Sequence, residues 1–219
     1  MAVRKIPKNY LVVTGSFASQ KNDQMNEFES ILEKEHMLLL EFDQRIDRFE
    51  TQSITIPIPG VPKGYTPDAL IHYLPDPETG EVPKSALIEV KHTNDLERNK
   101  EKYRKKFSEA ANYADARGWE FRIVTQNDIR TPRLENLKFL RTYRNVEMND
   151  IDHHTLIRMV KKLGDQCTPK SLIEGLASNT HDQLYWLPLV WRAILFHNLV
   201  IDWNQTLTND STIQLGGMH

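Results

Sequence analysis

The segment that most constrains the fold is the run at residues 85–91, which reads Ser-Ala-Leu-Ile-Glu-Val-Lys. A short apolar run of this kind predicts a buried β-strand. Successive side chains on a strand point to opposite faces. We therefore expect Glu89 and Lys91 to project together from the end of the strand, while Val90 points into the core.

The segments around this strand alternate between helical and extended patterns. The spacing predicts helices at 26–41, 95–117 and 133–143, and strands at 46–50, 52–58, 66–74 and 119–125. Residues 57–64 are rich in Pro and Gly and are expected to turn, and Gly118 suits a helix C-terminal cap. This order predicts an α/β fold with a mixed sheet flanked by helices.

A second, mainly α domain is expected after a boundary near 145–150. Helical spacing recurs at 151–163, 169–178 and 182–197, and residues 199–203 and 211–215 could form a two-stranded wing. Three helices and a hairpin predict a winged-helix-like domain, a variant of helix-turn-helix. The predicted organisation is an N-terminal arm (1–25), a first domain (26–147) and the winged-helix-like domain (148–219).

Composition limits the classes of protein to consider. The chain of 219 residues is 39% hydrophobic and 26% charged, which is ordinary for a globular protein. No apolar run approaches the length of a membrane span, and residues 1–8 lack the apolar segment of a signal peptide. Cys167 is the single cysteine, so no internal disulfide can form and a reducing cytosol is expected.

The net charge of −2 hides an uneven distribution. Residues 97–106 hold six basic and two acidic side chains, whereas residues 148–219 hold five basic and seven acidic ones. The basic segment could contact the phosphates of DNA. The alternative is a solvated helix face on which Glu97 and Glu101 pair with nearby cations. The candidate DNA-binding residues are Arg98, Lys100, Arg104 and Lys105.

Asp68, Glu89 and Lys91 are the candidate catalytic residues. Asp68 follows Pro67 at the start of one expected strand, and the other two end the next. Carboxylates that hold a divalent cation polarise a phosphate and lower the pKa of a bound water, and a neighbouring lysine orients or deprotonates that water. Hard oxygen ligands favour Mg²⁺, with Mn²⁺ as a substitute. The pattern thus predicts phosphodiester hydrolysis, against the alternative of a surface ion pair.

A third acidic group is expected from the first helix. Glu29 and Glu33 are four residues apart and would share one helix face, so the pattern leaves open which of them reaches the site. The candidate metal ligands are Asp68, Glu89 and Val90, together with Glu33 or Glu29 from the helix.

Longer stretches of the chain resemble the TnsA endonucleases, which are restriction-like subunits of heteromeric bacterial transposases in the PD-(D/E)xK superfamily. The resemblance rests on Phe28-Glu29-Ser30, Leu32-Glu33, residues 38–43, Tyr65-Thr66-Pro67-Asp68 and residues 87–91. It implies a restriction-endonuclease-like sheet in residues 26–147 and a catalytic set of Glu33, Asp68, Glu89 and Lys91. Some relatives carry glutamine where Glu89 stands.

The resemblance also implies a role in transposition. Proteins of this family cut double-stranded DNA at the 5′ ends of the transposon, together with a TnsB-like DDE transposase and a TnsC-like AAA+ regulator. A location in the bacterial cytoplasm, at the nucleoid, would follow. Two alternatives stay open: a stand-alone restriction or repair endonuclease of the same fold, and a non-catalytic DNA-binding adaptor.

Overall fold

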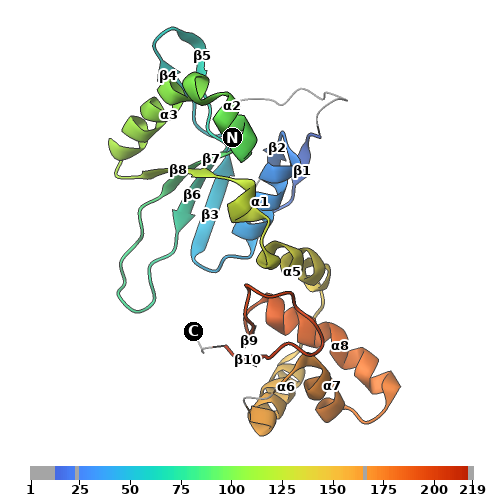
Figure 1. The fold of residues 1–219 in the computed structure, drawn as a ribbon. Helices are drawn as coiled ribbons and strands as arrows, with labels where there is room; N and C mark the ends of the chain where they lie inside the picture. The colour runs from blue at the N-terminus through green and yellow to red at the C-terminus, as the bar shows by residue number, and fades with distance from the viewer. Residues whose placement is uncertain (1–12, 23–24, 165–166, 217–219) are drawn as a thin grey trace. The chain divides into compact units, whose positions relative to one another are not determined.

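The computed structural model describes residues 13–22, 25–164 and 167–216, which form two compact units (Figure 1). The first unit ends at Arg130 and the second begins at Thr131. This division lies before the expected boundary at residues 147/148. The reason is that α5 (Pro132–Leu140) and the 3-10 helix η1 (Arg141–Tyr143) pack against α8 (Thr180–Leu195) of the second unit.

A four-stranded mixed sheet organises the first unit and confirms the predicted α/β class (Figure 1). The strand order is β3-β6-β7-β8, formed by Ile46–Thr51, Ala69–Tyr73, Ala86–Val90 and Glu120–Val124. The β3–β6 and β6–β7 pairs are antiparallel, and β7 runs parallel to β8. The two segments that carry the candidate catalytic residues therefore lie beside each other.

Every residue of β7 is buried, because helices pack against this strand. The helix α1 (Ile31–Glu41) packs against β3 and β7, and α3 (Lys100–Asp115) packs against β7 and β8 (Figure 1). Small residues on α3, Ala110 and Ala114, allow the helix to approach Leu87 closely within one core cluster. The interior strand expected at 85–91 is confirmed.

The helix predicted at 26–41 is longer than the helix that forms, α1. Asn26–Phe28 forms the strand β2, which pairs antiparallel with β1 (Gly15–Phe17). Helix α1 begins only after Ser30, whose side chain accepts a hydrogen bond from the Glu33 N–H and so caps the helix. Part of the expected N-terminal arm is therefore a strand, and residues 1–12 and 23–24 of that arm lie outside the described residues.

Two other elements differ from the sequence prediction. The expected helix at 95–117 is divided at Asn99 into α2 (Thr93–Arg98) and α3, and it is followed by Gly118 with φ of 70°. The strand expected at 52–58 is reduced to β4 (Ile56–Ile58), because the backbone of Gln52 has φ of 47° and leaves the extended region. The expected turn at 57–64 is instead the tip of a hairpin with β5 (Val61–Tyr65).

The second unit contains the expected helices and a short strand pair. These elements are α6 (Asp150–Leu163), α7 (Pro169–Leu176), α8, and the antiparallel strands β9 (Leu199–Val200) and β10 (Gln214–Leu215). Asn136 of α5 joins this unit through its amide, which donates to the Gln205 carbonyl and accepts from the Leu207 N–H. Within the described part of the chain, no helix is long and apolar enough to span a bilayer.

The packing of β7 generates a stability prediction. Leu87 is 1% exposed, so Leu87→Ala should lower the free energy of unfolding by about 2–5 kcal/mol through lost burial and a cavity. The matched control is Leu74→Ala in the same unit, where the side chain is 43% exposed and the loss should stay within about 1 kcal/mol. Urea denaturation of both variants measures the difference, and equal losses would contradict the assignment of β7 to the core.

Candidate active site

Strand register brings Asp68 and Glu89 together. Ala69 pairs with Ile88 across β6 and β7, and the Asp68 N–H donates to the Ile88 carbonyl at 2.9 Å. Asp68 consequently stands opposite Glu89 on the same face of the sheet. Its carboxylate is fixed by a second bond, because the Val90 N–H donates to Asp68 Oδ2 at 2.7 Å.

Lys91 places a cation among the oxygens of this pair. Its Nζ lies 2.7 Å from Glu89 Oε1, 3.6 Å from Asp68 Oδ2 and 3.1 Å from the Val90 carbonyl oxygen. The side chains of Glu89 and Asp68 are only 4% and 14% exposed, so water screens these charges weakly. One ammonium therefore partly neutralises two buried carboxylates.

Burial and like charges raise the pKa of the carboxyl group of Asp68. The pKa rises to about 7 because the group is desolvated and faces the negative charge of Glu89, although Lys91 and the Val90 N–H act in the opposite direction. Burial lowers the pKa of the Lys91 ammonium, but the charges of Asp68 and Glu89 outweigh that effect and raise it overall. Lys91 is thus protonated at neutral pH.

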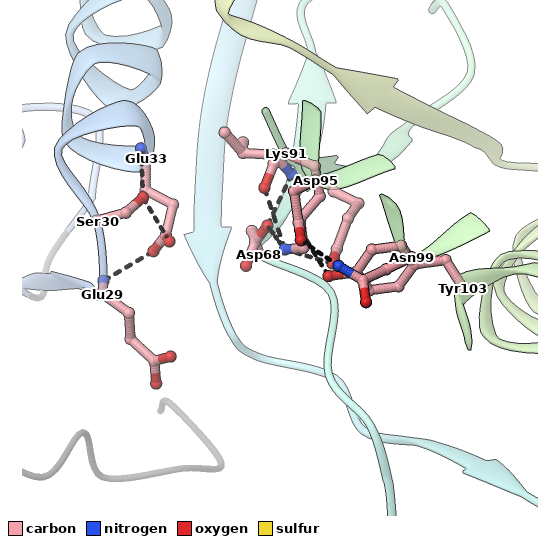
Figure 2. Close-up of polar contacts among 10 residues, drawn as sticks. Glu29, Ser30, Glu33, Asp68, Lys91, Asp95, Asn99 and Tyr103 are labelled. Carbon is pink, nitrogen blue, oxygen red and sulfur yellow. Dashed lines mark hydrogen bonds and ion pairs between the residues drawn. The ribbon is translucent and has the colours of Figure 1, made fainter. Parts of the chain in front are cut away.

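Glu33 approaches the same site from the start of α1. Its Oε2 accepts from the Glu29 backbone N–H at 2.8 Å, and its Oε1 accepts from the Ser30 hydroxyl at 2.8 Å (Figure 2). Burial raises the pKa of Glu33 to about 7, and the negative charge of Asp68 adds to the rise. Glu33 is therefore within electrostatic reach of Asp68, while bonds to its own helix terminus hold its carboxylate.

The geometry separates Glu29 from Glu33. Glu29 precedes the Ser30 cap and is outside the helix, so the two residues do not share a helical face as expected. The Glu29 side chain extends away from Asp68 and Lys91 (Figure 2). The charge of Glu33 is coupled to that of Asp68.

The oxygen set around Lys91 fits a hard divalent cation. Asp68, Glu89 and the Val90 carbonyl already surround a positive charge, and Mg²⁺ takes one or two carboxylates and completes its shell with water and phosphate. Among the described residues, however, no three His, Cys, Asp or Glu side chains are grouped so as to hold a metal ion. The carboxylate of Glu33 therefore does not join Asp68 and Glu89 in a three-ligand cluster.

The candidate DNA-binding residues lie on the helices that follow Lys91. Arg98 is in the last turn of α2, and Lys100, Arg104 and Lys105 are on α3, all four exposed. Arg104 Nη1 lies 3.6 Å from Glu101 Oε2, as the alternative of a solvated face expects. Lys105 donates to the Pro59 carbonyl at 2.6 Å, so it also ties α3 to the β4–β5 hairpin.

Several polar groups beside the site were not expected from the sequence. Asp95 accepts from the Asn99 side chain at 2.7 Å and from the Tyr103 hydroxyl at 2.6 Å, and the charge of Lys91 contributes to lowering the pKa of Asp95 (Figure 2). The hydrogen bond from Tyr103 is the largest cause of that lower pKa. Tyr65 belongs to the Tyr65-Thr66-Pro67-Asp68 motif, but nothing in the sequence indicated that its side chain lies near Glu89.

Part of the chain matches a known protein family. Residues 43–126 match the family model described as TnsA-like endonuclease N terminal. The matched segment runs from before β3 into α4 (Gln126–Ile129) and includes Asp68, Glu89 and Lys91, whereas Glu33 lies before it. The chain matches no curated protein.

The raised pKa of Asp68 predicts how stability depends on pH without metal. A carboxyl whose pKa rises from 3.8 to about 7 on folding stabilises the folded state fully below the unfolded pKa, and this contribution is lost as the pH rises through 7. Asp68→Asn removes that loss. In EDTA, the free energy of unfolding of the variant relative to wild type should therefore increase from pH 5 to pH 8 by about 1–3 kcal/mol. Urea titrations at both pH values test this, and a pH-independent difference would contradict it.

Proposed function

We propose that this chain is the DNA-cleaving subunit of a transposase. The proposal starts from the match of residues 43–126 to the TnsA-like endonuclease N-terminal family. In this proposal the chain hydrolyses phosphodiester bonds at the 5′ ends of the transposon during excision. The observation that carries the proposal is the buried group of Asp68, Glu89 and Lys91, whose oxygens already surround one cation.

The proposed chemistry assigns a task to each member of this group. Asp68, Glu89 and the Val90 carbonyl would hold Mg²⁺, which supplies Lewis-acid polarisation of the phosphate and a more acidic water. Lys91 would orient the attacking water and stabilise the negative charge that develops on the phosphate. Glu33 would add a negative charge near the site. This extra charge would favour binding of a divalent cation beside the Lys91 ammonium.

The exposed cations of α2 and α3 would bind the DNA backbone. They follow Lys91 directly in the sequence, so phosphates bound there would lie close to the catalytic group. Contacts to phosphate add affinity and fix register without reading sequence. The selection of transposon ends would then depend on partner proteins.

The second unit is proposed to be a winged-helix-like domain that docks proteins. Its helices and short antiparallel strands suit that pattern, and the seven acidic residues among positions 148–219 disfavour a DNA-binding surface. The partners that this proposal assigns are a TnsB-like DDE transposase and a TnsC-like AAA+ regulator.

The first test removes the catalytic charges. Asp68→Ala and Lys91→Met should each lower the rate of 5′-end cleavage by at least about a hundredfold in the presence of the partner transposase, because metal and charge stabilisation are lost. Lys84→Met, at an exposed loop lysine, is the matched control and should cut normally. Cleavage by either site variant at the wild-type rate would refute the assignment. Vigorous cutting of plasmid DNA by the wild-type chain alone would instead indicate a stand-alone nuclease.

The second test concerns DNA binding. Lys100→Gln with Arg104→Gln should weaken binding to DNA of any sequence and should lower the slope of log affinity against log salt by about 0.9 for each phosphate that is no longer bound. Lys161→Gln with Lys162→Gln, on the exposed face of α6, removes the same number of charges as a control. Equal slopes for the two double variants would show that α3 does not track phosphates.

A further inference from the structure

The face of the sheet that carries Glu89 also carries the core beneath α3. Leu87 and Glu89 are two residues apart on β7 and so point to the same side. On that side Leu87 packs in a cluster with Leu70 of β6, Ala110 of α3 and Tyr65 of β5. Glu89 therefore stands at the edge of an apolar cluster, and Tyr65 is a member of that cluster with a polar end.

Two buried oxygen atoms at this edge lack a hydrogen bond of standard geometry to any described residue. Tyr65 is 7% exposed and Glu89 is 3% exposed. Among the described residues, neither the Tyr65 hydroxyl nor Glu89 Oε2 has a hydrogen-bond partner of standard geometry. Leaving such groups unpaired costs about 1–3 kcal/mol each, so a hydrogen bond between the two oxygens would be favourable.

The charge environment assigns the donor in this pair. Burial raises the pKa of Tyr65, and the negative charge of Glu89 and a side-chain hydrogen-bond interaction with Glu89 raise it further. The phenol is therefore protonated throughout the neutral range and can only be the donor, while the carboxylate is the acceptor.

The ring of Tyr65 is held firmly enough to direct that hydroxyl. Its centroid lies 6.4 Å from that of Phe107, which in turn stacks on Tyr103 at 5.1 Å. Lys106 Nζ lies 5.8 Å from the Tyr65 ring centroid. Tyr65 also ends β5, three residues before Asp68, so one short connection places both residues around Glu89.

We propose that Tyr65 is a positioning residue for Glu89: its hydroxyl donates to Oε2 and keeps Oε1 turned toward Asp68 and Lys91. Oε1 is the oxygen that contacts the ammonium, so it faces the place where a cation would be bound. Partners of this kind, which hydrogen-bond to a metal-ligating carboxylate, fix its orientation and tune its affinity. The metal part of this inference rests on the proposed function.

Tyr65→Phe tests the proposal because it removes the hydroxyl and keeps the ring. In the full-length chain, calorimetric titration with Mn²⁺ alone should give a dissociation constant about 10–100-fold weaker than that of wild type. Tyr113→Phe is the matched control, since this tyrosine packs against the same core cluster and its ring lies beside Trp119. The control should bind Mn²⁺ as wild type does. Unchanged affinity in Tyr65→Phe would overturn the proposal.

A second measurement needs no metal and separates this inference from the proposed function. The ¹³C chemical shift of the Glu89 carboxyl group, assigned through Glu89→Gln and read at one fixed pH, should move in Tyr65→Phe and stay in place in Tyr113→Phe. If wild type binds no Mn²⁺, the proposed metal chemistry fails, and the carboxyl shift alone decides on Tyr65. A shift that is the same in wild type and Tyr65→Phe would then refute the positioning role.

Discussion

The site depends on the ion pairs that Lys91 forms with Glu89 and Asp68. Glu89 lies on an interior strand whose residues are all buried, where an isolated carboxylate would be strongly destabilising. The 2.7 Å contact from Lys91 and the Val90 N–H bond to Asp68 offset part of that cost. The remaining cost is visible in the raised pKa of Asp68, which burial and the negative charge of Glu89 raise despite the nearby Lys91.

Backbone hydrogen bonds of the sheet fix the positions of Asp68, Glu89 and Lys91. Asp68 and Glu89 are held by antiparallel register between β6 and β7, and the Lys91 N–H donates to the Val124 carbonyl of the parallel strand β8. The three side chains are thus fixed by backbone bonds on two sides, independently of the loops that connect the strands. This rigidity suits the proposed catalytic group, whose oxygens would have to keep their spacing when a cation binds.

The parts of the fold that depend on local pattern could be predicted from the sequence. Alternation along residues 85–91 was sufficient to place Glu89 and Lys91 on one face of a buried strand, and the order of elements gave the mixed sheet. The start of α1 was missed because the Ser30 cap and the pairing of β2 with β1 override the helical spacing of residues 26–30. The first compact unit also ends earlier than the boundary expected near 145–150, since α5 packs against α8, which is distant in sequence.

Tyr65 shows why part of the site could not be read from sequence. No local pattern distinguishes a tyrosine whose ring fills a core from one whose hydroxyl also faces a carboxylate. The difference arises only when β5, β7 and α3 meet, because Leu87 and Tyr65 then share one cluster and Glu89 is left at its edge. The same cluster contacts Phe107, and the stacking of Phe107 on Tyr103 extends it to Asp95. Helix α3, which carries exposed cations, therefore packs on the cluster that contains Tyr65 and Leu87. In the proposed function, phosphates bound to α3 would lie on a helix that shares its core with the strand of Glu89.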